Sequence, residues 1–162
     1  IYELVSYVKS NGESQVTARE NSSRALGIKP YSTQTEAAFL TTLNHALDNV
    51  LNTNRRCIVQ HEVSIAHVFD GNTEYSDLFY SGRFDFVVYE QEYKGTDIPI
   101  LAIELDGKEH QENDIVMQRD ARKNEICRRH GFELIRVENS YARRYNYIKD
   151  ILIQYFKSVK SY

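Results

Sequence analysis

Two short segments of the chain carry acidic residues among apolar ones. They read RFDFVVY at residues 83–89 and IPILAIELD at residues 98–106. Because the side chains of a strand alternate between its two faces, each segment has apolar residues on both of them. Strands of this kind are covered by helices on both sides. The chain is therefore predicted to enclose a sheet between helices.

The other elements follow the order of a compact α/β domain. Apolar spacing and turn residues predict helices at 33–51, 112–130 and 142–159, and strands at 56–69, 83–89, 98–106 and 132–137. The Lys94-Gly95 turn between the two acidic strands predicts a hairpin. Residues 1–30 are predicted to form an N-terminal extension, and residues 31–162 one domain.

Asp85, Glu104 and Asp106 pose an energetic problem within these strands. An ionised carboxylate in an apolar interior is costly unless it is paired or bound to a cation. If the strands pair as a hairpin, Asp85 and Glu104 converge near the strand ends, where a cation between them removes their repulsion. Mg²⁺ suits such hard oxygen ligands and keeps waters for chemistry. The alternative is pairing with a nearby arginine, for which the candidates are Arg83, Arg119 and Arg136.

The order of these motifs resembles the PD-(D/E)XK nuclease superfamily. A strand bearing Asp85 precedes a strand bearing Glu104-x-Asp106, and both lie between helices. More narrowly, AIELDGKEH at 102–110, RDARKN at 119–124 and GFELIRV at 131–137 are similar to small nuclease-like domains of unassigned function. Those domains are related to very short patch repair endonucleases and to restriction-endonuclease-like domains. The resemblance covers roughly residues 33–138.

The resemblance implies a fold, a cofactor and an activity. The fold is α/β with a restriction-endonuclease-like core, in which helices flank a central mixed sheet of about four to five strands. The cofactor is Mg²⁺ or Mn²⁺, held by Asp85, Glu104 and the backbone carbonyl of Leu105. The activity is that of an endonuclease, in which the metal positions water for in-line attack on a phosphodiester of DNA.

One departure concerns the lysine that the superfamily carries two residues after the glutamate. Here that position is Asp106, which the resemblance makes a third acid of the site. Lys123 is the candidate replacement, because it shares a helical stripe with Asp120 and Cys127 that can face the sheet. Lys108 is a second candidate, and a surface ion pair with Asp120 is the alternative for Lys123.

Two further residues are site candidates with ordinary alternatives. Glu36 completes a Thr33-x-x-Glu36 capping box, and related nucleases also place a helix-borne glutamate near the metal. His110 follows the Asp106-Gly107 turn, where it can contact the phosphate, shuttle a proton or simply lie on the surface.

Basic residues gather toward the C-terminal end of the chain. Residues 1–116 hold nine Lys or Arg and 18 Asp or Glu, a net charge of −9, whereas residues 117–162 hold 11 and five, a net charge of +6. Such asymmetry is a hint of a surface that faces a polyanion, but on charge alone it favours a solvated basic helix face. The tyrosines of the last helix either stack bases or pack on the core. The candidate nucleic-acid-binding residues are Lys108, Arg119, Arg128, Arg129, Arg143 and Arg144.

Cysteine content and hydropathy narrow the class of protein. Cys57 and Cys127 are too few for a disulfide framework and are expected to be reduced, buried thiols. With no leader segment and no apolar run of membrane length, the chain is expected to be cytoplasmic, without a membrane partner. Nucleic acid is the expected partner, and further domains of a longer chain or a second copy are others. The alternative function, favoured by Asp106, is an inactive nuclease-fold module that binds nucleic acid or protein.

Overall fold

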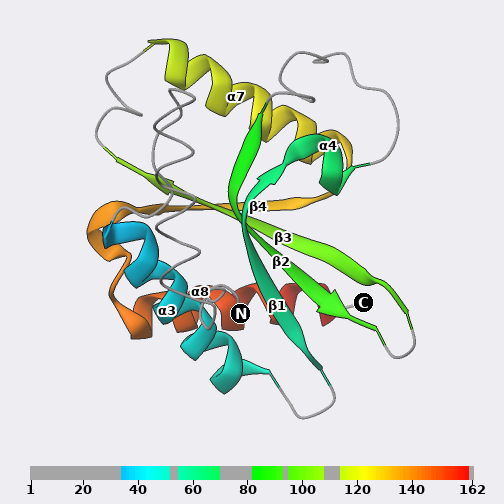
Figure 1. The fold of residues 1–162 in the computed structure, drawn as a ribbon, viewed down its shortest axis with the longest axis vertical. Helices are drawn as coiled ribbons and strands as arrows, with labels where there is room; N and C mark the ends of the chain where they lie inside the picture. Colours follow the sequence, from blue (N-terminus) through cyan, green and yellow to red (C-terminus); the bar gives the residue numbers. More distant parts are fainter. Residues whose placement is uncertain (1–33, 52–54, 70–81, 93–94, 108–113, 161–162) are drawn as a thin grey trace, which may run out of the picture. The chain divides into compact units, whose positions relative to one another are not determined.

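The computed structural model describes residues 34–51, 55–69, 82–92, 95–107 and 114–160 (Figure 1). The chain divides into two compact units, one made of Ile1–Val59 with Ser140–Tyr162 and the other of Gln60–Asn139. The second unit holds most of the sheet and all of the acidic strands, whereas a pair of helices makes up most of the described part of the first.

A four-stranded mixed sheet forms the centre of the second unit. Its strands are β1 (Cys57–Ser64), β2 (Arg83–Gln91), β3 (Asp97–Asp106) and β4 (Glu133–Glu138), in the order β1-β2-β3-β4. β2 and β3 form the predicted antiparallel hairpin, with Phe86 opposite Ile103. β4 pairs with β3 in parallel, with Arg136 beside Glu104. The predicted α/β class and the predicted mixed sheet are confirmed.

The two acidic strands are buried on both faces, as their apolar pattern predicts. Phe84 and Phe86 on one face of β2 and Val87 on the other are fully buried. In β3, every residue from Leu101 to Leu105 is buried, and this stretch includes the carboxylate of Glu104. The fold therefore buries Glu104 fully, whereas Asp85 and Asp106 are half-buried.

Helix α7 (Asp114–Arg129) ends in a turn that leads the chain directly into β4. Gly131 adopts a positive φ of 63°, the left-handed conformation that glycine enters without strain. The N–H of Gly131 donates to the carbonyl of Arg128, and that of Phe132 donates to the carbonyl of Cys127, the Schellman pattern of a helix C-terminus. The predicted helix stop at Gly131 is confirmed, and the turn brings β4 alongside β3.

The strand predicted at 56–69 is too long at its C-terminal end. β1 ends at Ser64, and residues Ile65–Val68 form the short helix α4. Ile65 is fully buried, and Phe69 packs edge-on against Phe84 and stacks on the His130 ring at 4.3 Å. A short apolar run is compatible with both a strand and a helical turn, so its pattern alone does not decide the conformation.

The first unit is built on a pair of helices, α3 (Gln34–Val50) and α8 (Tyr145–Lys160), which pack against each other. The Tyr145 ring lies against the His45 ring in a tilted arrangement, with the ring centroids 4.6 Å apart, and the Tyr145 hydroxyl accepts a 2.8 Å hydrogen bond from the Asn49 amide. This tyrosine therefore packs between helices, the structural alternative to base stacking. The last helix begins at Tyr145, later than predicted, because a turn at residues 142–143 follows the 3-10 helix η1 (Asn139–Tyr141). The apolar residues buried on the two helices are Phe39, Leu40, Leu43, Ala46, Leu47, Ile148, Leu152 and Phe156.

Within the described ranges, none of the helices combines the length and the apolar character that crossing a membrane demands.

Candidate metal centre

Asp85 and Glu104 lie side by side at the open end of the β2–β3 hairpin. The paired part of the ladder begins at Phe86 and Ile103, and the two acids occupy the next position. The backbone N–H of Asp85 donates to Glu104 Oε2 across 2.7 Å, and the backbone N–H of Leu105 donates to Asp85 Oδ2 across 2.9 Å. Each carboxylate thus accepts a main-chain hydrogen bond from the opposite strand. These charge-assisted bonds fix both side chains where the strands separate.

Glu104 is the most deeply buried acid of the group, with only 2% of its surface exposed. Its Oε1 accepts a 2.8 Å ion-paired hydrogen bond from Lys123 Nζ, which also donates to the carbonyl oxygen of Arg83 across 2.6 Å. The Lys123 side chain is itself only 14% exposed. α7 therefore directs this lysine into the acidic group, as the stripe through Asp120 and Cys127 predicts.

Arg136 on β4 joins the remaining acids. Its Nη1 lies 3.3 Å from Asp106 Oδ1, 3.4 Å from Asp120 Oδ1 and 4.0 Å from Glu104 Oε1. Its Nε and Nη2 donate to Asn124 Oδ1, and Nη2 also donates to the backbone carbonyl of Asp120. Asp106, the residue at the usual lysine position, is thus ion-paired to an arginine from the neighbouring strand.

We call this group the acidic centre, and its formal charges sum to a net negative value. It contains four carboxylates (Asp85, Glu104, Asp106 and Asp120) and two basic groups (Lys123 and Arg136), so two formal negative charges remain. The donors are hard oxygens, the ligands that Mg²⁺ and Mn²⁺ prefer.

Asp85, Glu104 and the carbonyl of Leu105 offer hard oxygen atoms, the kind of ligand that a divalent cation prefers. The N–H of Leu105 points to Asp85, and in a strand the N–H and C=O of one residue face the same neighbour. The Leu105 carbonyl therefore faces the side on which Asp85 lies. Arg83, an alternative partner for these acids, instead donates its Nη1 to the Glu62 carbonyl.

Both cysteines are free thiols, as predicted. Cys127 lies on the face of α7 that carries Lys123, and it is 2% exposed. Burial, followed by the negative charge of Glu104, raises the pKa of Cys127 to about 12. Its thiol is therefore neutral at physiological pH. Cys57 is half-buried, so the prediction of a buried thiol is confirmed for Cys127 and wrong for Cys57.

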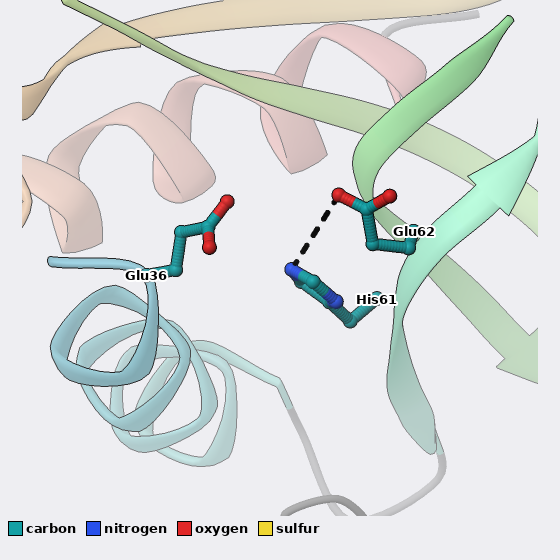
Figure 2. A group of neighbouring side chains, drawn as sticks. All are labelled: Glu36, His61 and Glu62. Carbon is teal, nitrogen blue, oxygen red and sulfur yellow. Dashed lines mark ion pairs between the residues drawn. The ribbon is translucent and has the colours of Figure 1, made fainter. Parts of the chain in front are cut away.

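Three further predicted site residues are Lys108, His110 and Glu36. Lys108 and His110 lie outside the described residues, as does Thr33, the partner in the capping box of Glu36. Glu36 itself lies in the first turn of α3, half-buried, and its side chain is drawn in Figure 2. The same figure shows His61 and Glu62 on β1, whose Nε2 and Oε2 atoms are 4.0 Å apart.

The predicted nucleic-acid-binding arginines fall on both units. On α7, Arg119 is exposed, whereas Arg128 and Arg129 both donate to Glu125, at 2.5 Å and 2.9 Å. These two hydrogen bonds hold the pKa of Glu125 at about 2. In the first unit, Arg143 is exposed and Arg144 lies over the Tyr141 ring, 4.5 Å from its centroid.

Two members of this arrangement were not identified from the sequence as functional residues, Asp120 and Asn124. Asp120 contacts Arg136 through its carboxylate and its backbone carbonyl, and Asn124 contacts it through its amide group. The Asn124 side chain accepts two hydrogen bonds from Arg136. The signal was their spacing, since Asp120, Asn124 and Cys127 recur at intervals of four and three residues on one helical face. The missing information was the neighbour of that face, which depends on the pairing of β4 with β3.

Comparison with known proteins assigns the chain to one protein family. No curated protein and no solved structure is similar to this chain at a significant level. Residues 28–154, which include the whole acidic centre, match a family described as "Protein of unknown function (DUF2726)". The chain belongs to the DUF2726 family.

Proposed function

We propose that this domain is a metal-dependent nuclease that hydrolyses phosphodiester bonds of nucleic acid, with DNA as the expected substrate. One observation carries the proposal: Asp85 and the buried Glu104 meet at the open end of a hairpin, held by each other's strands. Placing two carboxylates beside each other, one of them buried, is unfavourable unless a cation offsets their charge.

Asp85, Glu104 and the Leu105 carbonyl would hold the metal. When bound, Mg²⁺ or Mn²⁺ supplies positive charge against the negative charge that develops on the phosphate. The chain keeps the ligands in place before binding, because the N–H groups of Asp85 and Leu105 anchor both carboxylates. Preorganised oxygen ligands of this kind reduce the ordering cost of binding.

Lys123 would supply the second positive charge of the site. Its ammonium group is held by Glu104 Oε1 and the Arg83 carbonyl, beside the two proposed ligands. A fixed cation in a water-poor site stabilises developing phosphate charge more strongly than it does in water. In this proposal α7 provides the charge that other nucleases of the resembled superfamily carry two residues after the glutamate.

The remaining residues have supporting roles. Arg119, Arg143 and Arg144 would contact phosphates along the substrate, and Arg128 and Arg129 would do so once released from Glu125. Two roles implied by the resemblance remain predictions: Glu36 near the metal, and His110 in phosphate contact or proton transfer. The free cysteines favour the cytoplasm as the compartment. A second copy or further domains would complete the assembly on a duplex.

The second candidate function is a catalytically inactive module that binds nucleic acid or a protein. The pairing of Asp106 with Arg136 favours it, because the strand position that usually supplies lysine carries a neutralised acid. In this case DNA binds with a strong salt dependence but is not cut.

A cleavage assay separates the two functions. Supercoiled plasmid and labelled single- and double-stranded DNA and RNA are incubated with Mg²⁺, Mn²⁺ or EDTA. We expect metal-dependent cleavage that is lost in Glu104→Gln and kept in Glu133→Gln, a matched change at an exposed glutamate of β4. If wild type cuts none of these substrates but binds them, the nuclease proposal is wrong and the binding module replaces it.

A further inference from the structure

Arg136 ties three elements of the second unit together. It projects from β4, contacts Asp106 on β3, and reaches Asp120 and Asn124 on α7. Its Nε, Nη1 and Nη2 atoms each have at least one acceptor within 3.4 Å. A guanidinium group presents donors in a fixed planar fork, so acceptors on several sides define its position closely. We call Arg136, Asp106, Asp120 and Asn124 the arginine clamp.

The arginine clamp contacts α7 at residues on either side of Lys123. Asp120 lies one turn before this lysine and Asn124 immediately follows it, and both are bonded to Arg136. The rotation of α7 about its axis and its position along the sheet are therefore fixed next to Lys123. A lysine side chain has four flexible methylene groups, so its ammonium group reaches one point reproducibly only when its backbone is fixed.

We propose that Arg136 and Asp106 are positioning residues that hold Lys123 against Glu104 by anchoring α7. This inference rests on the proposed catalytic charge of Lys123. Neither residue needs to touch the substrate. A misplacement of about 1 Å in a catalytic group can reduce turnover about 100-fold, so the rigidity of this anchor affects the rate directly.

The clamp also explains why an acid stands two residues after Glu104. A lysine at position 106 would place a second cation beside the Arg136 guanidinium, which now lies 3.3 Å from the Asp106 carboxylate. Like charges at such a distance repel each other, whereas Asp106 attracts the arginine. Asp106 and Lys123 thus form two parts of one arrangement: β3 carries the anchor for Arg136, and α7 carries the catalytic cation.

A double-mutant cycle tests whether Arg136 affects the reaction rate through Lys123. Arg136→Lys keeps the charge but cannot span the acceptors of the clamp, and Arg122→Lys, at an exposed position of α7, is its matched control. We expect Arg136→Lys to lower kcat about 10- to 100-fold with little change in KM. In a Lys123→Ala background the same change should lower kcat less than about twofold further. Full multiplication of the two losses would overturn the proposal, because Arg136 would then act without Lys123.

The acid of the clamp is tested by rescue. Asp106→Asn removes the charge that attracts Arg136 and is expected to lower kcat, whereas Asp106→Glu, which keeps the carboxylate, is expected to recover most of it. Equal losses in the two variants would contradict a positioning role that depends on the ion pair.

A readout without nuclease activity tests the anchor itself. In a Cys57→Ser background, alkylation of the buried Cys127 by a thiol reagent reports how firmly α7 is docked. We expect Arg136→Lys to accelerate this alkylation at least about tenfold, with unchanged helix content by circular dichroism. Unchanged alkylation would overturn the proposal. If wild type has no nuclease activity while alkylation still rises in Arg136→Lys, the proposed function fails and the anchor stands.

Discussion

Asp85 and Glu104 are joined through the backbone of the strands that carry them: the Asp85 N–H donates to Glu104 Oε2, and the Asp85 carboxylate accepts the N–H that follows Glu104 in β3. The two carboxylates therefore stay together although their charges repel each other. Such an arrangement is stable only if other groups, or a bound cation, offset the repulsion.

Asp85→Asn tests whether this repulsion is present without metal. The amide oxygen of asparagine can still accept the Leu105 N–H, while one negative charge is removed beside Glu104. We expect the melting temperature in EDTA to rise by about 2–4 °C, which corresponds to about 1 kcal/mol for a chain of this size. In wild type, excess Mg²⁺ or Mn²⁺ should raise it, and in the variant the ion should have little effect. A lower melting temperature in EDTA would indicate that Asp85 is a structural partner of a basic group.

Lys123→Met tests the ion pair with Glu104. Removing the lysine leaves a carboxylate that is 2% exposed without its closest cation. Breaking one partner of a buried pair typically costs about 3–5 kcal/mol, so the free energy of unfolding in EDTA should fall by about 3 kcal/mol. Because a metal can take over the missing charge, Mn²⁺ should raise the melting temperature more in this variant than in wild type. Denaturant unfolding with and without Mn²⁺ measures both effects.

Glu125→Gln tests whether Arg128 and Arg129 reach nucleic acid. In the wild-type chain both arginines bind Glu125, whose pKa of about 2 keeps it ionised at all ordinary pH values. Releasing them should tighten DNA binding at low salt and steepen the plot of log K against log salt by about one to two units. Fluorescence anisotropy over a salt series gives this slope, with Glu133→Gln as the control. An identical slope would place these arginines outside the interface.

Ionisation of Cys127 should destabilise the fold at high pH. Burial raises its pKa from an ordinary value of 9.0 to about 12, so the unfolded chain loses this proton at a lower pH than the folded chain does. Between these two values the folded state holds more protons, and the free energy of unfolding falls as pH rises. Cys127→Ala should flatten this part of the pH dependence. At pH 9, mass spectrometry of alkylated protein should find Cys57 modified well before Cys127.

The strands that carry the site were predictable because their pattern of apolar residues fits one arrangement, a strand that is covered on both faces. Apolar residues on both faces of β2 and β3 require cover on both sides, and both strands are buried as predicted. The end of α7 was predictable from Gly131, because few residues other than glycine adopt its φ of 63°. The extent of β1 was not, because Ile65–Val68 has too little periodicity to separate a strand from a helical turn.

The sequence predicted the acidic residues of the candidate site and Lys123, but it did not identify all of the residues that hold them in place. Asp85, Glu104 and Lys123 were identified from the sequence, and the structure brings them together. Arg136 was one of several candidate partners, since the sequence does not state that β4 pairs in parallel with β3 and places Arg136 beside Glu104. Asn124 was not identified, because its role depends on where the guanidinium of Arg136 lies.

The central claim is that Asp85 and Glu104 hold a divalent cation at the open end of the hairpin. Isothermal titration calorimetry with Mn²⁺ on wild type, Glu104→Gln and the control Glu133→Gln tests it most directly. We predict one site in wild type and in the control, with affinity at least about 100-fold weaker in Glu104→Gln, since a charged ligand is lost. Equal Mn²⁺ affinity in Glu104→Gln and wild type would contradict the claim.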